Sequence, residues 1–420
     1  MRDLSQFEQF FYYKTINRYY SNVRILAEYE KPVNKTQLCV ALRLLIEKYP
    51  MLVMSVDGKS PKATIVNEIL FDNVVEFVTV EEESVESILN SYHKKYFTYN
   101  ENSVTWELKV INSKYILLLC DHLFFDGVST KNFQVELSKL LDNEGEYDRM
   151  LFKRSSNSIV FPAPDEFINY KAPEGFVIPE IESPYKDLMD NGNLTTIECQ
   201  NGITKVSDCE IVTVDNDEMA ILLKLCRDHN VKLTSLLVLL SNLSVKEFLP
   251  TKDIETAIPV DIRGKIQNEN HPETISFKFG LFVSSIGVKL PNINKLDSLI
   301  NLKEINWPCV EYINTYIHTH APISEYYISS LEGIDMKQYT DARFSKMENA
   351  SIEISNLGQV KESKIKAMWF DQPSDTFNIN IISTDKQTTL VLRCCRHDWV
   401  TPWKKSLQKT LNKIIIKQEN

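Results

Sequence analysis

The sequence runs Tyr115-Ile116-Leu117-Leu118-Leu119-Cys120 and then Asp121-His122-Leu123-Phe124-Phe125-Asp126-Gly127, an apolar segment that leads at once into a turn with polar residues. An apolar run of this length, followed by Asp-Gly turn chemistry, predicts a buried strand that ends just before His122. Beyond this turn, apolar side chains recur at helical spacing, and Ser129 or Thr130 can cap the helix. The segment therefore predicts a strand, a turn that carries a histidine, and a helix.

His122 is the residue of this segment with the clearest chemical use. Imidazole gains and loses a proton near neutral pH, so a histidine at a strand end can act as a general base. The pattern His-x-x-x-Asp-Gly also occurs by chance, and a surface turn in which Asp126 and Gly127 supply only turn geometry explains it equally well. On this segment alone, both interpretations stay open.

The composition is ordinary for a folded protein of 420 residues, with 43% hydrophobic and 25% charged residues. The formal net charge of -10 argues against a protein that binds nucleic acid by neutralising phosphates. The N-terminus lacks the apolar region of a signal peptide, and no segment approaches the ~20 apolar residues that span a bilayer, so we expect a cytoplasmic protein. The cysteines form no Cys-x-x-Cys pair, and we expect reduced, buried thiols.

The chain divides into two parts of mixed helix and strand pattern. Residues 1–155 alternate between the two patterns and predict a first subdomain of α/β layers. Residues 156–200 lose this periodicity and collect prolines, which is the composition of an extended crossover linker. Residues 201–420 return to mixed patterns and predict a second subdomain, with a cleft between the two.

Three local patterns in the second part predict particular structures. Thr234 is expected to cap a helix, and the pair Thr401-Pro402 is expected to begin the last one. His318 and His320 are expected on one side of a strand as a solvated pair. Because no third ligand lies nearby in the sequence, we predict no metal site there.

The last helix carries an apolar stripe with lysines around it. Its members are Trp403, Leu407, Leu411, Ile414 and Ile415. The stripe is typical of a helix docked on its own domain, and this is the favoured interpretation. A basic helix that lies on a membrane or lipid-droplet surface shows the same pattern, so weak peripheral contact remains the alternative.

Polar groups close two further strand-like segments. The segment Pro259-Val260-Asp261-Ile262-Arg263 ends in an arginine, which is either an exposed charge or an ion-pair partner for Asp126. The segment Glu353-Ile354-Ser355-Asn356-Leu357-Gly358 ends in polar residues that form either a plain turn or part of a site. The usual marks of serine hydrolases, dinucleotide sites, P-loops and zinc proteases are absent from the sequence.

Taken in order, these segments resemble the fungal alcohol O-acetyltransferase family, within the acyl-CoA-dependent acyltransferases that have the chloramphenicol acetyltransferase type of fold. The resemblance covers nearly the whole chain and rests on residues 19–23, 41–52, 122–129, 232–237, 259–263 and 355–358. Asp121 stands where condensation domains have another histidine, which makes a carrier-protein condensation role less favoured. The Asp-Phe-Gly-Trp-Gly motif of plant acyltransferases is absent.

The resemblance implies a fold and a set of site residues. Two similar subdomains are expected to enclose a tunnel in which acyl-CoA and acceptor meet at the histidine. His122 resembles the general base, and Asp126, followed by Gly127, resembles the carboxylate that orients the histidine loop by pairing with Arg263. Ser355 or Asn356 is the candidate donor to the oxyanion. No segment identifies residues that bind the CoA phosphates.

The resemblance also implies an activity. A monomeric enzyme is expected to transfer the acetyl group of acetyl-CoA directly to a small alcohol, without a metal or a covalent acyl-enzyme. Transfer to an amine or amino-alcohol uses the same chemistry and is the first alternative. A catalytically silent acyl-CoA-binding protein on the same fold is the alternative from another functional class.

Overall fold

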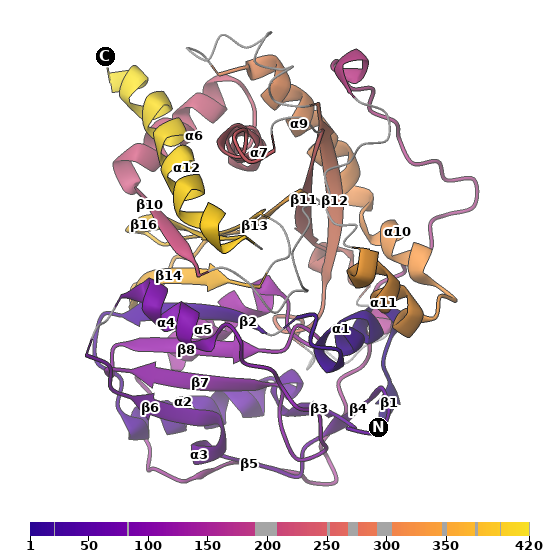
Figure 1. The fold of residues 1–420 in the computed structure, drawn as a ribbon. Coiled ribbons are helices and arrows are strands. Elements are labelled where there is room, and N and C mark those ends of the chain that lie inside the picture. Colours follow the sequence, from indigo (N-terminus) through magenta and orange to yellow (C-terminus); the bar gives the residue numbers. More distant parts are fainter. Residues whose placement is uncertain are drawn as a thin grey trace.

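The computed structural model describes residues 1–20, 22–81, 84–189, 208–249, 253–267, 276–291, 305–346, 351–373, 377–394 and 396–419. These residues form two halves, each built on a β-sheet, with the first part of the chain below and most of the second part above (Figure 1). The subdomain bounds 1–155, 156–200 and 201–420 stay a prediction, because part of the predicted linker lies outside the described residues.

A five-stranded sheet in the order β14-β2-β8-β7-β6 forms the centre of the lower half. Its strands are β2 (Val23–Tyr29), β6 (Val75–Val78), β7 (Trp106–Ile111), β8 (Tyr115–Cys120) and β14 (Ile365–Asp371). The helices α2 (Lys35–Lys48) and α5 (Gly127–Leu140) pack against each other, and α5 packs on β2. The smaller elements are β1 (Arg2–Asp3), α1 (Gln6–Ile16), η1 (Pro50–Val53), β3 (Met54–Val56), β4 (Lys62–Ile65), β5 (Glu68–Leu70), α3 (Phe71–Val74), α4 (Val85–Tyr92), β9 (Met150–Lys153), η2 (Pro164–Glu166) and η3 (Lys186–Leu188).

A six-stranded sheet in the order β10-β16-β15-β13-β11-β12 forms the centre of the upper half. Its strands are β10 (Glu210–Asp215), β11 (Ile254–Asp261), β12 (Val283–Leu290), β13 (Ile352–Gln359), β15 (Phe377–Ser383) and β16 (Gln387–Arg393). The longer helices are α6 (Asn216–Asp228), α7 (Leu233–Ser244), α9 (Trp307–His320), α11 (Met336–Lys346) and α12 (His397–Glu419). Shorter turns of helix are η5 (Arg263–Lys265), η6 (Ala321–Ile323), α10 (Glu325–Ile328) and η7 (Ser329–Leu331).

The apolar run 115–120 forms β8, with the bounds that the sequence predicts. Every residue of β8 is buried, because the strand lies between β2 and β7 and has side chains packed on both of its faces. A strand buried on both faces has no solvent-facing positions, which explains the absence of alternation in its sequence. The strand ends where the histidine turn begins.

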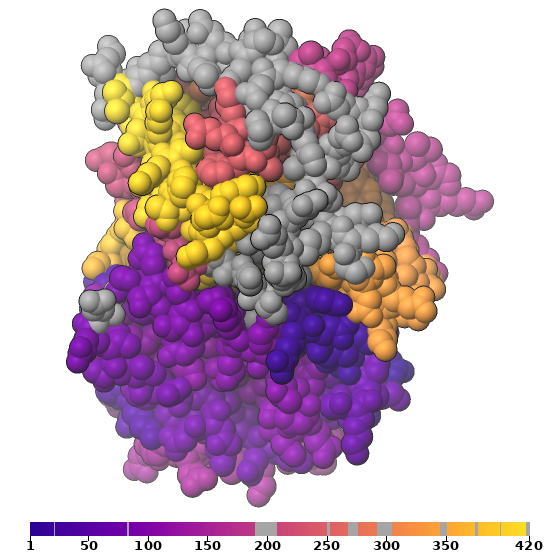
Figure 2. Space-filling view, viewed as in Figure 1, coloured from indigo at the N-terminus to yellow at the C-terminus, as the bar shows by residue number. Residues whose placement is uncertain are grey.

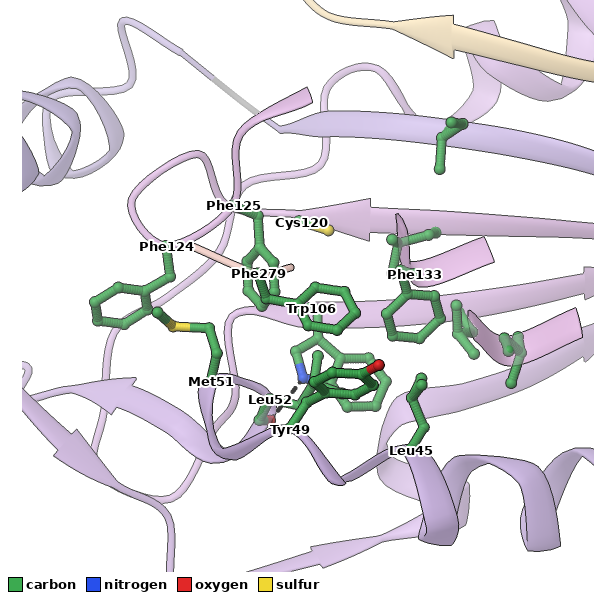
Figure 3. Close-up of a cluster of buried hydrophobic side chains, with 14 of the residues drawn as sticks. Leu45, Tyr49, Met51, Leu52, Trp106, Cys120, Phe124, Phe125, Phe133 and Phe279 are labelled. Atoms are coloured by element: carbon green, nitrogen blue, oxygen red, sulfur yellow. Dashed lines mark hydrogen bonds between the residues drawn. The ribbon is translucent and has the colours of Figure 1, made fainter. Parts of the chain in front are cut away.

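Aromatic side chains fill the core beneath that turn (Figure 3). Phe124 and Phe125 from the turn, Trp106 from β7 and Phe133 from α5 are at most 2% exposed. The Trp106 indole also donates a hydrogen bond of 2.9 Å to the Leu52 carbonyl. Burial of large apolar groups on both sides of His122 therefore fixes the turn in place.

Strand β14 was not predicted from the sequence. It belongs to the second part of the chain, yet it pairs antiparallel with β2 in the lower sheet, and the next strand, β15, lies in the upper sheet. Asp371 at the end of β14 accepts hydrogen bonds from Arg24 of β2 and Arg393 of β16, and all three side chains are fully buried. This charged cluster ties the two sheets together.

Three predicted helix starts are wrong. The residue that caps α5 is Asp126 and not Ser129 or Thr130. Its carboxylate accepts a hydrogen bond of 2.8 Å from the Ser129 N–H. Lys232 occupies the cap position of α7, which places Thr234 inside that helix. The last helix starts at His397, so Pro402 lies within it.

The apolar stripe of α12 is buried in the core of the upper half. Trp403, Leu407, Leu411 and Ile415 are at most 5% exposed and pack with α7 and the upper sheet, while Ile414 packs at the edge of that core. The favoured interpretation, a helix docked on its own domain, is thus confirmed, and the stripe is not available to a membrane. In the part of the chain that the structure describes, no helix is long and apolar enough to cross a bilayer.

The cysteine and histidine predictions have different outcomes. The six cysteines within the described ranges are all buried thiols outside disulfides, as predicted. The strand predicted for His318 and His320 is wrong, because both residues lie at the end of helix α9. His318 is exposed, whereas His320 is buried, with its Nδ1 2.8 Å from the Tyr327 hydroxyl. No cluster of three or more metal-ligating side chains occurs among the described residues.

Candidate active site

The histidine turn joins the end of β8 to the start of α5. Asp121 stabilises it from below, because its carboxylate accepts hydrogen bonds from the Leu123 N–H at 2.8 Å and the Thr15 hydroxyl at 2.9 Å. Burial raises the pKa of Asp121 to about 6. The turn is therefore fixed by polar contacts as well as by the aromatic core.

The His122 ring lies against two aromatic rings. It stacks on Phe11 of α1 with a centroid distance of 4.2 Å and an interplanar angle of 13°, and it meets the edge of Tyr20 at 5.8 Å and 69°. Burial, together with the positive charge of Lys14, lowers the pKa of His122 to about 4. The imidazole is therefore neutral near pH 7.

Asp126 holds three segments together. Its Oδ1 accepts hydrogen bonds from the Ser129 N–H at 2.8 Å and the Ser129 hydroxyl at 2.9 Å, and its Oδ2 accepts one of 2.8 Å from the Phe282 N–H. Arg263 Nη2 lies 2.9 Å from Asp126 Oδ1, so the ion pair predicted as one of two possibilities is present. Although burial alone raises the pKa of Asp126, the charge of Arg263 and these hydrogen bonds hold it below its usual value.

Arg263 reaches this carboxylate from the upper half of the molecule. Its Nε donates to the Phe277 carbonyl at 2.9 Å, and its Nη1 lies 2.9 Å from Asp261 Oδ1. Its side chain is only 14% exposed. The ion pair between Asp126 and Arg263 therefore links the turn after β8 to the segment after β11.

Gly127 is enclosed by side chains of two other strands. A Cβ atom at this position would lie 2.8 Å from Leu357 Cδ2 of β13 and 3.0 Å from Phe370 Cζ of β14. Any larger residue would push these side chains away from the first turn of α5. Close packing thus favours glycine here.

A cavity of about 450 Å³ opens beside His122, between the two halves. Each residue predicted for the site lines it, namely His122, Asp126, Gly127, Arg263, Ser355 and Asn356. Ser355 and Asn356 lie within β13, so the plain turn considered for them is wrong. The Asn356 amide is already engaged, since it donates to the Thr234 hydroxyl at 3.3 Å and accepts from the Gly358 N–H at 2.9 Å.

Other residues of this cavity were missed from the sequence. Tyr20 donates a hydrogen bond of 3.2 Å to Gln372 Oε1, and Gln372 in turn donates to the carboxylate of Glu353. Burial and the nearby Glu353 raise the pKa of Tyr20 well above its usual value. The aromatic sequence of α1 was the available signal, but nothing in it shows that the helix faces His122.

A family model described as alcohol acetyltransferase matches residues 3–402 of this chain. Among curated proteins, none matches it. Several solved structures share the fold of this chain at low sequence identity. Similarity at this level of identity shows a common fold and no common activity.

Three of these structures illustrate the range. The trichothecene 15-O-acetyltransferase TRI3 from Fusarium sporotrichioides has a TM-score of 0.68 at 14% identity, over 98% of this chain and 94% of that one. The first condensation domain of the CDA synthetase has a TM-score of 0.64 at 10% identity, over 99% and 96%. The epimerization domain from the third module of tyrocidine synthetase B has a TM-score of 0.60 at 14% identity, over 99% and 96%.

These neighbours confirm the predicted fold, with two subdomains of the chloramphenicol acetyltransferase type. The family match extends over almost the whole chain and includes every residue that lines the cavity beside His122. This protein therefore belongs to the alcohol acetyltransferase family and is an acyltransferase.

Proposed function

We propose that this protein transfers the acetyl group of acetyl-CoA to the hydroxyl group of a small alcohol, with His122 as the general base. The observation that carries the proposal is a neutral imidazole, fixed against Phe11, in a cavity between the two halves. A general base has to be unprotonated at the working pH and within reach of its substrate. His122 meets the first condition, and its place in the cavity supports the second.

The ring nitrogens of His122 have different surroundings. Nδ1 is buried, so we take Nε2 as the nitrogen that faces a substrate. For Nε2 to act as a base, the neutral imidazole has to carry its own proton on Nδ1. Nε2 can then accept the proton of an alcohol while the alcohol oxygen attacks the thioester carbonyl.

The remaining steps follow from this proton transfer. The attack gives a tetrahedral oxyanion and an imidazolium, the carbon–sulfur bond then breaks, and the leaving thiolate of CoA takes the proton back from His122. We assign the oxyanion donor to the Ser355 hydroxyl, because this group makes no hydrogen bond among the described residues, whereas the Asn356 amide is engaged.

The position of Glu353 favours the alternative acceptor, an amine or amino-alcohol. Its carboxylate lines the same cavity, and carboxylates attract protonated amines. An amine or amino-alcohol that binds there would have to lose its charge before it attacks. Transfer to nitrogen is therefore the second candidate.

The purified protein should release free thiol from acetyl-CoA only when an acceptor is present. The experiment supplies a panel of alcohols, amines and amino-alcohols, follows thiol release and identifies the products by mass spectrometry. Acetate esters are the expected products. Amides would favour the alternative acceptor, and a protein that binds acetyl-CoA without any thiol release would instead be a silent binding protein.

The rate of transfer should stay constant from neutral pH down to weakly acidic pH. An unperturbed histidine has a pKa of ~6.5, but that of His122 is lowered to about 4, so its active neutral form persists and the acid limb of kcat/KM lies near the lower value. A profile of kcat/KM between pH 4 and 8 measures this limb. Asp121, whose pKa is raised to about 6, is the nearest other candidate for a limb in that range. A limb near pH 6 that persists in the Asp121→Asn variant would contradict the lowered pKa of His122.

A further inference from the structure

We propose that Lys14 is a positioning residue of this active site, whose ammonium group keeps a positive charge beside His122. The proposal rests on the proposed role of His122 as the general base. Lys14 lies on α1 and lines the same cavity as His122. Nothing in the sequence pattern singles it out, since lysines are common on helix surfaces.

Four aromatic rings surround the Lys14 ammonium, and we call them the aromatic cage. Nζ lies 4.4 Å from the ring centroid of Tyr20, 5.1 Å from that of Phe11, 5.2 Å from that of Phe10 and 5.3 Å from that of Phe344. A cation within about 6 Å of an aromatic face is attracted by the negative potential of that face. The cage therefore favours the charged form of Lys14 at a fixed place.

The cage is built from segments that are distant in the sequence. Phe10 and Phe11 come from α1, Tyr20 follows that helix, and Phe344 comes from α11. The two helices lie side by side on the surface of the molecule (Figure 2). Asn17 and Tyr19 both donate hydrogen bonds to Asp341 of α11, which holds the helices together.

Two rings of the cage also touch His122. Phe11 stacks on the imidazole at 4.2 Å, and the edge of Tyr20 meets it at 5.8 Å. The ammonium group and the imidazole thus share two aromatic neighbours, Phe11 and Tyr20. Aromatic rings screen charge far less than water does, so the positive charge of Lys14 acts on the imidazole in addition to burial, which is the larger effect.

The other charged groups around His122 do not replace this effect. Asp121 and Asp126 flank it on its own turn, but Asp126 is paired with Arg263. Glu353 of β13 and Arg343 of α11 line the same cavity, and the Tyr20 hydroxyl is neutral near pH 7. Lys14 is the cation whose charge lowers the pKa of His122.

The charge of Lys14 affects the protonation of His122 in the free enzyme more than it affects the rate of the transfer step. In the free enzyme, a protonated His122 would be repelled by the Lys14 ammonium, and this repulsion is larger than the attraction by Asp126. During transfer, the positive imidazolium and the negative oxyanion form together. Lys14 repels the imidazolium and attracts the oxyanion, so the two effects partly cancel. Removal of the charge should therefore move the acid limb of the pH profile to higher pH.

The test compares Lys14→Met and Lys14→Gln, which lack the charge, with Lys14→Arg, which keeps it. In each variant, the titration of His122 is followed by NMR of the imidazole C–H signals without substrate, and the His122→Ala variant assigns the signal. The acid limb of kcat/KM is measured in parallel, and thermal melts check folding. We expect the titration midpoint to rise by about one pH unit in both neutral variants and to stay near the original in Lys14→Arg.

The two readouts separate this proposal from the proposed function. An unchanged His122 midpoint in a folded neutral variant would overturn the role of Lys14, whatever the activity. A shift that is equally large in Lys14→Arg would also overturn it, because packing and not charge would then be responsible. If the protein transfers no acetyl group at all, the proposed function fails, while the NMR titration still decides the role of Lys14.

Discussion

The His122→Ala variant is expected to lose at least ~10²-fold, and up to ~10⁴-fold, of the transfer rate while it remains folded, because general-base catalysis contributes effects of that size. The fold should survive, since the residues that anchor the turn are its neighbours Leu123, Phe124 and Phe125, which are at most 1% exposed. The imidazole itself only rests against Phe11 and Tyr20.

The measurement combines single-turnover transfer at saturating acetyl-CoA with a thermal melt. His318→Ala is the matched control, because His318 is exposed on α9 and is not among the residues that line the cavity. The control should transfer at the original rate. A folded His122→Ala variant with near-normal turnover would show that another group accepts the proton.

Much of the site could be predicted because its parts are local in the sequence. The strand β8, the turn with His122 and the start of α5 are consecutive, and each has its own signal, namely an apolar run, a polar turn and helical spacing. Only the cap residue was misassigned. Asp126 serves both as the helix cap and as the partner of Arg263, and the sequence analysis considered only the second of these roles.

Other parts could not be predicted, because they depend on contacts between distant segments. Strand β14 pairs with β2 across more than three hundred residues, and no local pattern assigns a strand to one sheet or the other. The cage around Lys14 likewise depends on α11 lying beside α1.

The start of α12 shows how packing overrides a local rule. Proline is favoured in the first turn of a helix, yet Pro402 lies further inside, since the helix begins at His397. Burial of Val400 in the upper core stabilises the additional turn before the proline.

The second large effect is expected at the ion pair between Asp126 and Arg263. Removal of one partner leaves the other charge in a site where Asp126 is 2% and Arg263 is 14% exposed. An uncompensated charge in such a place costs ~3–5 kcal/mol, which is the loss expected when Arg263→Ala leaves Asp126 unpaired. The loss in Asp126→Asn should be smaller, because Arg263 keeps its ion pair with Asp261. Asp126→Asn and Arg263→Ala should therefore each lower the free energy of unfolding and the transfer rate, because the pair holds the histidine turn against η5.

The double variant should be little worse than the worse single variant, because both changes remove the same interaction. Urea unfolding and transfer rates of the four proteins complete a double-mutant cycle. The exposed pair of Lys35 and Asp72, with side chains 50% and 59% exposed, provides the control cycle, for which a coupling of only ~0–1 kcal/mol is expected. Additive effects at Asp126 and Arg263 would mean that the pair does not couple the two halves. The orientation of His122 would then have to depend on the contacts of Asp121 and on the aromatic core beneath the turn.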